Sequence, residues 1–328
     1  MEKIETYTQF IEETEIVEPD LKGNSFIGGK AVEVSLSHLK EDCIIPVFSK
    51  DNESTISHYE FINEIQKAVR IASPSISITR PIIKVTHPVK GRIPSAIGKP
   101  VKELKEEEKT IYYERCAFIF QILDKKENVN GDDLNLTIGG VRAYNQENLY
   151  STKSLEKFKL FIGYQNMVCT NLCISTDGFS DEVKVSSIGD LADHVMRLIQ
   201  NYDMKRHLGM MERMSKFKLN EDEFAHFIGK LRIYNHLDKA KKSALPRILF
   251  TDNHINHVAR SYLTDPNFGC DSEGNINLWQ LYNLLTDANK VSYIDNNIER
   301  NVNAYELMNK LGDSILYEEP NWFLHIII

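Results

Sequence analysis

Residue types that often carry chemistry form several short patterns in this chain. The stretch from Asn24 to Ala31 contains Gly-Gly-Lys. A phosphate-binding loop, however, needs a glycine where Asn24 stands and a magnesium-binding hydroxyl where Ala31 stands. The stretch from Asp271 to Asn275 places glycine at the fourth position of a calcium loop, whereas calcium loops need it at the sixth. We therefore expect plain turns at both places.

Possible metal ligands and nucleophiles occur only in isolated pairs. His254 and His257 lie three positions apart beside Asp252, but two histidines without a clear third ligand do not predict a metal site. Cys169 and Cys173 would lie about 13 Å apart on one strand, beyond disulfide reach, so we expect core thiols. The Glu-x-Lys pattern at 182–184 is too short to identify a nuclease. We expect no cofactor and no metal.

The most informative feature is a basic segment in an acidic protein. The chain of 328 residues has 39 Lys and Arg against 47 Asp and Glu, a net charge of −8. Between positions 204 and 250, eleven basic and five acidic residues give a local net charge of +6, which leaves −14 for the remainder. Such a segment can follow a phosphate backbone. The alternative is a solvated helix surface whose lysines offset neighbouring acids.

The residues of this segment that we predict to contact phosphates are Lys205, Arg206, Arg213, Lys216, Lys218, Lys239, Lys241 and Lys242. Arg142 is a further candidate from the preceding β-rich part of the chain.

Composition and the first residues indicate the cellular setting. The chain is 42% hydrophobic and 26% charged, which is typical of a folded protein. It contains no apolar run long enough to span a membrane, and its first five residues carry a net negative charge, unlike a signal peptide. Five cysteines without a secretion signal indicate reduced thiols. We expect a cytoplasmic protein that does not bind membranes.

Hydrophobic periodicity divides the chain into an arm and two halves. Residues 1–25 carry seven acids before position 21 and predict a flexible acidic arm. Residues 26–186 alternate polar and apolar side chains over several stretches, which predicts strands. Residues 187–328 follow helical spacing and end in an apolar run at 322–328 that predicts a final strand. The expected fold is α+β, an antiparallel β-rich N-terminal half followed by a helical C-terminal half, and we expect the two halves to pack on one core.

Particular signals locate the elements. In the β-rich half we expect strands at 32–36, 44–48, 116–123, 134–138 and 158–174, with a hairpin turn at Asn130-Gly131 and a helix after Ser57. Prolines exclude a long helix from 73–100, and 102–109 is helix-prone. In the helical half we expect helices at 188–202, after Asn220, at 278–285 and from 294 to a stop at Gly312. A short strand is expected at 247–250.

Longer stretches resemble a Bacteroidales-type family of domain-of-unknown-function proteins, akin to the phage/plasmid-like proteins of mobile elements. The stretches that carry this resemblance are IIPVFSKDNE (44–53), ISHYEF (56–61), HPVKGRIP (87–94), YYER (112–115), GGVRAYN (139–145), FIGYQNMVCTNLC (161–173) and LWQLYNLLTDANK (278–290). The resemblance implies a bacterial or phage-derived setting and an association with mobile DNA, and it assigns no activity to individual residues.

Two functions of different classes follow. The first is a non-enzymatic DNA-associated protein, such as a single-strand binding or annealing accessory, which would bind single- or double-stranded DNA. The order of strands and helix is similar to the β-β-β-α core of single-strand annealing proteins, which is an analogy of fold alone. The second is a protein-interaction module, such as an anti-restriction or host-takeover factor, which would bind a host protein or self-associate through the C-terminal strand. An enzyme with a site built from dispersed residues is a third alternative.

Overall fold

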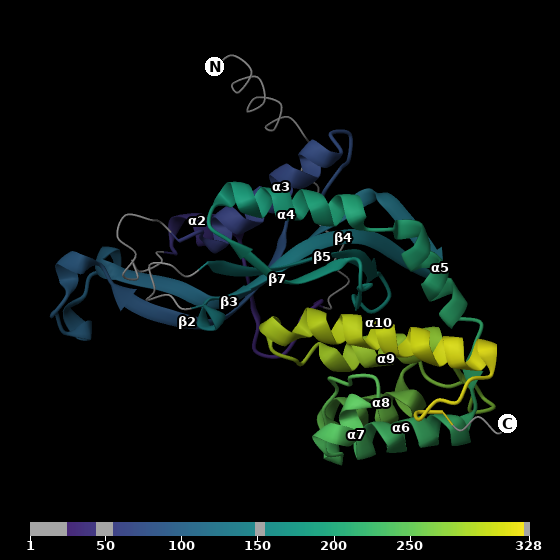
Figure 1. Cartoon of the computed structure of the whole chain (residues 1–328). Helices are drawn as coiled ribbons and strands as arrows, with labels where there is room; N and C mark the ends of the chain where they lie inside the picture. The colour runs from purple at the N-terminus through teal and green to yellow at the C-terminus, as the bar shows by residue number, and fades with distance from the viewer. Residues whose placement is uncertain (1–24, 44–54, 148–154, 325–328) are drawn as a thin grey trace.

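A curled antiparallel sheet with helices on both faces forms the frame of the molecule (Figure 1). The computed structural model describes residues 25–43, 55–147 and 155–324. The strand expected at 44–48 lies outside these residues. So does the predicted acidic arm at 1–25, except for its last residue. The β-rich part at 32–185 and the mainly helical part at 188–317 confirm the predicted α+β class.

The main sheet follows the order β1-β2-β3-β4-β5-β6, with β7 also paired to β5, and these strands pair antiparallel. Strands β8 and β9 form a separate small sheet. The strands are β1 (Val32–Val34), β2 (Ile82–Arg92), β3 (Lys109–Val129), β4 (Asp132–Ala143), β5 (Glu156–Asn166), β6 (Leu172–Cys173), β7 (Phe179–Val185), β8 (Lys218–Leu219) and β9 (Ile276–Asn277).

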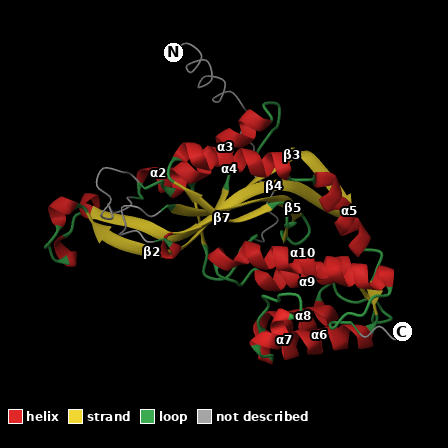
Figure 2. Ribbon diagram, in the orientation of Figure 1, coloured by secondary structure: helices red, strands yellow, loops and turns green. Residues whose placement is uncertain are grey.

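The helices cover the two faces of the sheet and continue beyond it (Figure 2). Helices α3 and α4 pack together on one face, whereas α9 and α10 lie on the other, followed by α8 and α6. The helices are α2 (Leu36–Glu41), α3 (His58–Ala72), α4 (Ile188–Asn201), α5 (Met204–Met214), α6 (Glu221–His236), α7 (Lys239–Ser243), α8 (Asp252–Thr264), α9 (Leu278–Asn289) and α10 (Ile294–Tyr317).

Alternation along the strands sends side chains to two apolar clusters. Phe118 and Phe120 of β3 point to the face covered by α3, where Phe61 packs against Phe118. Ala117 and Ile119 of the same strand point to the opposite face, against the apolar side chains of α10. Because the central strands are buried on both faces, they appear in the sequence as continuous apolar runs.

Local signals account for several element boundaries. Ser57 and Glu60 form a capping box at the start of α3, and Asn220 and Glu223 form one at the start of α6. The turn between β3 and β4 contains Asn130 and Gly131, both with positive φ (54° and 91°), as a tight hairpin turn requires. These three predictions are confirmed.

Other boundaries differ from the prediction. Residues 247–250 have no regular structure, because their polar groups are bound by Asn303 and Arg300 of α10 instead of a strand. The helix-prone stretch 102–109 forms only short 3₁₀ turns, at Val101–Glu103 and Glu106–Glu108, before β3 begins. Gly312 lies inside α10, where a ring carbon of Phe217 lies 3.4 Å from the position of its missing Cβ.

The end of the chain also differs where it is described. Residues 322–324 form a turn packed on the core and not the beginning of a strand. The remaining four residues of that predicted strand lie outside the described residues.

Candidate functional site

The two glycine-containing motifs are turns, as predicted. Gly29 has a positive φ of 69° and leads into β1. The side chain of Asp271 accepts hydrogen bonds from the backbone N–H groups of Glu273 and Asn275. Because this carboxylate is bound by its own loop, it closes a turn before β9 and α9.

The two histidines of α8 have separate partners. The Nδ1 atom of His254 lies 2.9 Å from the Thr251 hydroxyl, and its Nε2 atom lies 3.1 Å from the Ser292 hydroxyl. The Nε2 atom of His257 lies 3.0 Å from a carboxylate oxygen of Asp287. Across residues 25–43, 55–147 and 155–324, no three His, Cys, Asp or Glu side chains gather as metal ligands.

The five cysteines are all free thiols. Cys173 is buried in β6, and Cys169 is half-buried in the turn before it. Burial raises the pKa of the Cys169 thiol to about 12. At neutral pH this thiol is therefore protonated and a weak nucleophile.

Arg142 does not lie on the surface. Its side chain is 0% exposed, and its guanidinium forms ion pairs with Glu147 and Glu156 between the rings of Tyr144 and Phe158. A guanidinium enclosed in this way cannot reach a phosphate, so Arg142 is removed from the candidate contacts. The sequence offered no sign of these partners, because Glu147 and Glu156 are separated from Arg142 by 5 and 14 positions.

The remaining predicted contacts divide into two groups. The first group lies on α5 and the segment that follows it, and consists of Lys205, Arg206, Arg213, Lys216 and Lys218. The second lies on α7 and consists of Lys239, Lys241 and Lys242. Helix α6, which is about 24 Å long at 1.5 Å per residue, connects the two groups. The predicted contacts therefore fall into one group before α6 and one group after it.

Two members of the α5 group, Lys205 and Arg213, share one face of the helix. Lys205, Gly209 and Arg213 are spaced four residues apart and so lie above one another on the helix surface. The opposite face buries His207, Met211 and Met214. Lys205, Arg206 and Lys216 are exposed and make no ion pair with any other described residue. We call Lys205, Arg206, Arg213, Lys216 and Lys218 the α5 basic surface.

Two members of the α5 basic surface have acidic neighbours. Arg213 lies 2.6 Å from Asp313 of α10. The contact between Lys218 and Asp271 is looser, at 3.8 Å.

Two of the three α7 lysines, Lys241 and Lys242, are held by neighbouring residues, whereas Lys239 is exposed. Lys241 lies 3.8 Å from Asp238. Lys242 donates to the carbonyl oxygen of Asn235 at 3.1 Å and lies over the ring of Tyr234. The contacts of α7 fit the alternative interpretation, a solvated helix surface whose lysines offset neighbouring acids. The contacts of the α5 group fit this interpretation less well.

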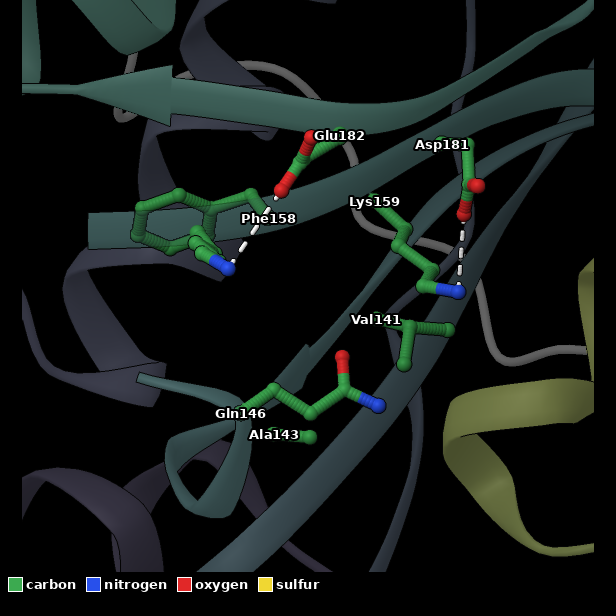
Figure 3. A pocket seen from close by; sticks show the side chains of 8 residues that line it. Val141, Ala143, Gln146, Phe158, Lys159, Asp181 and Glu182 are labelled. Atoms are coloured by element: carbon green, nitrogen blue, oxygen red, sulfur yellow. Dashed lines mark ion pairs between the residues drawn. The ribbon is translucent and has the colours of Figure 1, made fainter. Parts of the chain in front are cut away.

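A pocket that the sequence did not predict opens beside the end of the sheet (Figure 3). Its volume is about 170 Å³. Residues of β4, the turn after it, β5 and β7 line it, namely Val141, Ala143, Gln146, Lys157, Phe158, Lys159, Asp181 and Glu182. The two lysines occupy alternate positions of β5, which was the available sequence signal for a polar strip on this face.

Ion pairs cross the pocket between β5 and β7. Lys159 lies 2.8 Å from Asp181, and Lys157 lies 3.3 Å from Glu182. Lys184 also contacts Glu182, at 3.1 Å. The hydrogen bonds from Lys184 and Lys157 lower the pKa of the Glu182 carboxyl below its ordinary value, so this wall of the pocket stays negatively charged at neutral pH.

Comparison with protein families confirms one part of the resemblance, a Bacteroides-type domain of unknown function. Residues 10–324 match the family described as "Domain of unknown function, B. Theta Gene description (DUF3871)". The chain belongs to this family. The family description specifies no activity and no link to mobile elements. No curated protein and no solved structure matches the chain. Among the described residues, no helix of this family member is long and apolar enough to cross a membrane.

Proposed function

We propose that this family member is a non-enzymatic DNA-associated protein of a mobile element that binds phosphate backbones through the α5 basic surface. The observation that carries the proposal is the exposure of Lys205, Arg206 and Lys216 without an ion pair among the described residues. Cations that are not neutralised locally are available to displace counterions from a nucleic acid. The strongly acidic remainder discourages indiscriminate binding.

A glycine at the centre of this face supports the proposal. Gly209 is exposed in the middle of α5, and a Cβ built on it meets no atom within 4 Å. Glycine costs a helix about 1 kcal/mol relative to alanine, and packing gives no reason for it here. A smooth position between Lys205 and Arg213 would let a phosphate backbone approach the helix closely.

The proposal is tested by fluorescence anisotropy of a labelled oligothymidine and of a matched duplex at about 50 mM salt, where phosphate contacts are strong. We expect saturable binding of the single strand. An unlabelled competitor protein should not reduce this binding. Failure to bind either DNA under these conditions would falsify the proposal.

A second candidate is a protein-interaction module. It is favoured by a projecting β2–β3 arm, formed by the outer halves of β2 and β3 and distinct from the predicted acidic arm at residues 1–25. The arm extends away from the helices, at the left of Figure 1. The loop at its tip exposes Ile97 and Val101, whose exposed fractions are 75% and 69%. Exposed apolar side chains on a projecting hairpin are typical of contacts with another protein.

This candidate makes a different prediction. We expect a host protein or a second copy to cross-link to the full chain. This cross-link should be lost in the double variant Ile97→Ser with Val101→Ser. It should be retained in the control Leu263→Ser, which changes a side chain of α8 that is 73% exposed. Equal recovery with both variants would count against a role of the arm.

A further inference from the structure

We propose that the pocket between β4, β5 and β7 binds a small zwitterion with one ammonium and one carboxylate group, such as a free α-amino acid. This inference is independent of DNA binding, because the pocket and the α5 basic surface share no residue.

The volume of the pocket and its apolar floor suit such a ligand. Its volume of about 170 Å³ accommodates several water molecules or a ligand of a few heavy atoms. Val141 and Ala143 belong to the floor (Figure 3) and are buried, at 1% and 5% exposure. A short apolar side chain can cover them, whereas a long one would exceed the space.

The charges of the pocket walls favour a zwitterion. Lys157 and Lys159 supply two positive charges from β5, and Asp181 and Glu182 supply two negative charges from β7. An anion or a cation would meet as many like charges as opposite ones. A molecule with both charges can place its carboxylate against a lysine and its ammonium against an acid.

Each of these pairs has an exposed acidic partner that a ligand can displace. Asp181 and Glu182 are each 53% exposed, whereas Lys157 is 38% exposed and Lys159 only 14% exposed. Because the acid of each pair faces solvent, water screens the pair and its contribution to stability is small. The carboxylate of the ligand can therefore replace Asp181 on Lys159 while the released Asp181 accepts from its ammonium.

Gln146 completes the site from the turn after β4. Its amide nitrogen donates to Asp295 of α10 at 3.3 Å, which fixes the orientation of the amide. Its carbonyl oxygen has no hydrogen-bond donor among the described residues and can accept from the ligand.

The test titrates L-alanine into the full chain and follows binding by saturation-transfer NMR. N-Acetylalanine amide, acetate and methylammonium are the matched probes that lack one or both charges. We expect L-alanine to bind with a Kd of about 1 mM or tighter and the three matched probes to bind at least about tenfold more weakly. Binding of the neutral amide or of acetate as tight as that of L-alanine, or no saturation by L-alanine at about 10 mM, overturns the proposal.

Variants assign the binding to this pocket. Lys159→Met keeps the aliphatic stem but removes the charge, and Asp181→Asn removes the opposite one. Each should weaken L-alanine binding by about tenfold or more, with an unchanged melting temperature as evidence of folding. The control Lys126→Met, an exposed lysine of the β3–β4 hairpin, should bind as the parent does. If both pocket variants fold and bind L-alanine normally, the ligand sits elsewhere and the proposal fails.

Discussion

Individual polar side chains in the core determine how the molecule responds to acid. His207 is 1% exposed and lies among the rings of Tyr164, Tyr202 and Tyr305, and its Nδ1 atom lies 2.8 Å from the Tyr202 hydroxyl. Burial lowers the pKa of His207 to about 3. Burial, together with the nearby Arg142, lowers the pKa of His58 to a similar value. Both imidazoles are therefore neutral when the protein is folded.

The first prediction concerns the pH dependence of stability. Below about pH 6.5 the unfolded chain takes up protons that the buried histidines of the folded state do not accept. Stability is therefore complete above that pH and falls as the pH drops toward 3, by up to about 1.4 kcal/mol per pH unit for each histidine. Urea unfolding between pH 7 and pH 5 measures this slope. His207→Phe, which keeps the ring contacts, should reduce the slope, and an unchanged slope would contradict the assigned role.

The second prediction concerns Gly209. Because a Cβ at this position meets no atom within 4 Å, Gly209→Ala should raise the free energy of unfolding by about 0.5–1 kcal/mol. If the glycine exists for close approach of a phosphate backbone, the same variant should weaken DNA binding. A variant that is more stable and binds DNA equally well would remove Gly209 from the binding surface.

At the scale of elements, Arg142 joins segments that are distant in the sequence. Its guanidinium forms ion pairs with Glu147 after the turn that follows β4 and with Glu156 at the start of β5, and donates to the carbonyl oxygen of Ile56 before α3. Glu156 in turn accepts from the backbone N–H of Ile56. One buried cation thus fastens the α3 layer to the sheet.

The third prediction follows from this arrangement. Arg142→Met removes the guanidinium that pairs with the buried carboxylates of Glu147 and Glu156, and removing one partner of a buried pair costs about 3–5 kcal/mol. Chemical denaturation should show a loss of this size. The triple change Arg142→Met, Glu147→Gln and Glu156→Gln should recover part of it, because the two carboxylate charges are removed together with the guanidinium. A single variant as stable as the parent would show that the network does not hold these elements.

Elements that are set by local sequence signals could be predicted, and those set by tertiary contacts could not. Helix α3 and the β3–β4 hairpin were predicted because capping and turn residues act over a few positions. The α10 boundary was missed because a tertiary contact, the packing of Gly312 on Phe217, decides it. The sequence shows which residues of the segment are basic, but their separation into two groups depends on α6. The pocket depends on the pairing of β5 with β7, which no local pattern specifies.

For the whole molecule, the net charge of −8 conceals an uneven surface. Lys241 of α7 is held by Asp238, and Lys242 by Asn235 and Tyr234, whereas Lys239 is exposed without an ion pair among the described residues. Lys205, Arg206 and Lys216 of α5 are exposed and lack an ion-pair partner among the described residues. The proposed function therefore depends on one of two basic surfaces that are similar in composition and differ in their neighbours. This difference provides a matched comparison within one chain.

The most direct test measures the salt dependence of oligothymidine binding for two triple variants. The α5 variant combines Lys205→Gln, Arg206→Gln and Lys216→Gln, and the α7 variant combines Lys239→Gln, Lys241→Gln and Lys242→Gln. Each lost phosphate contact should reduce the slope of log K against log salt by about 0.7 for a single strand. We predict a reduction of about 2 for the α5 variant and a slope close to that of the parent for the α7 variant. Equal slopes for the parent and the α5 variant would contradict the account.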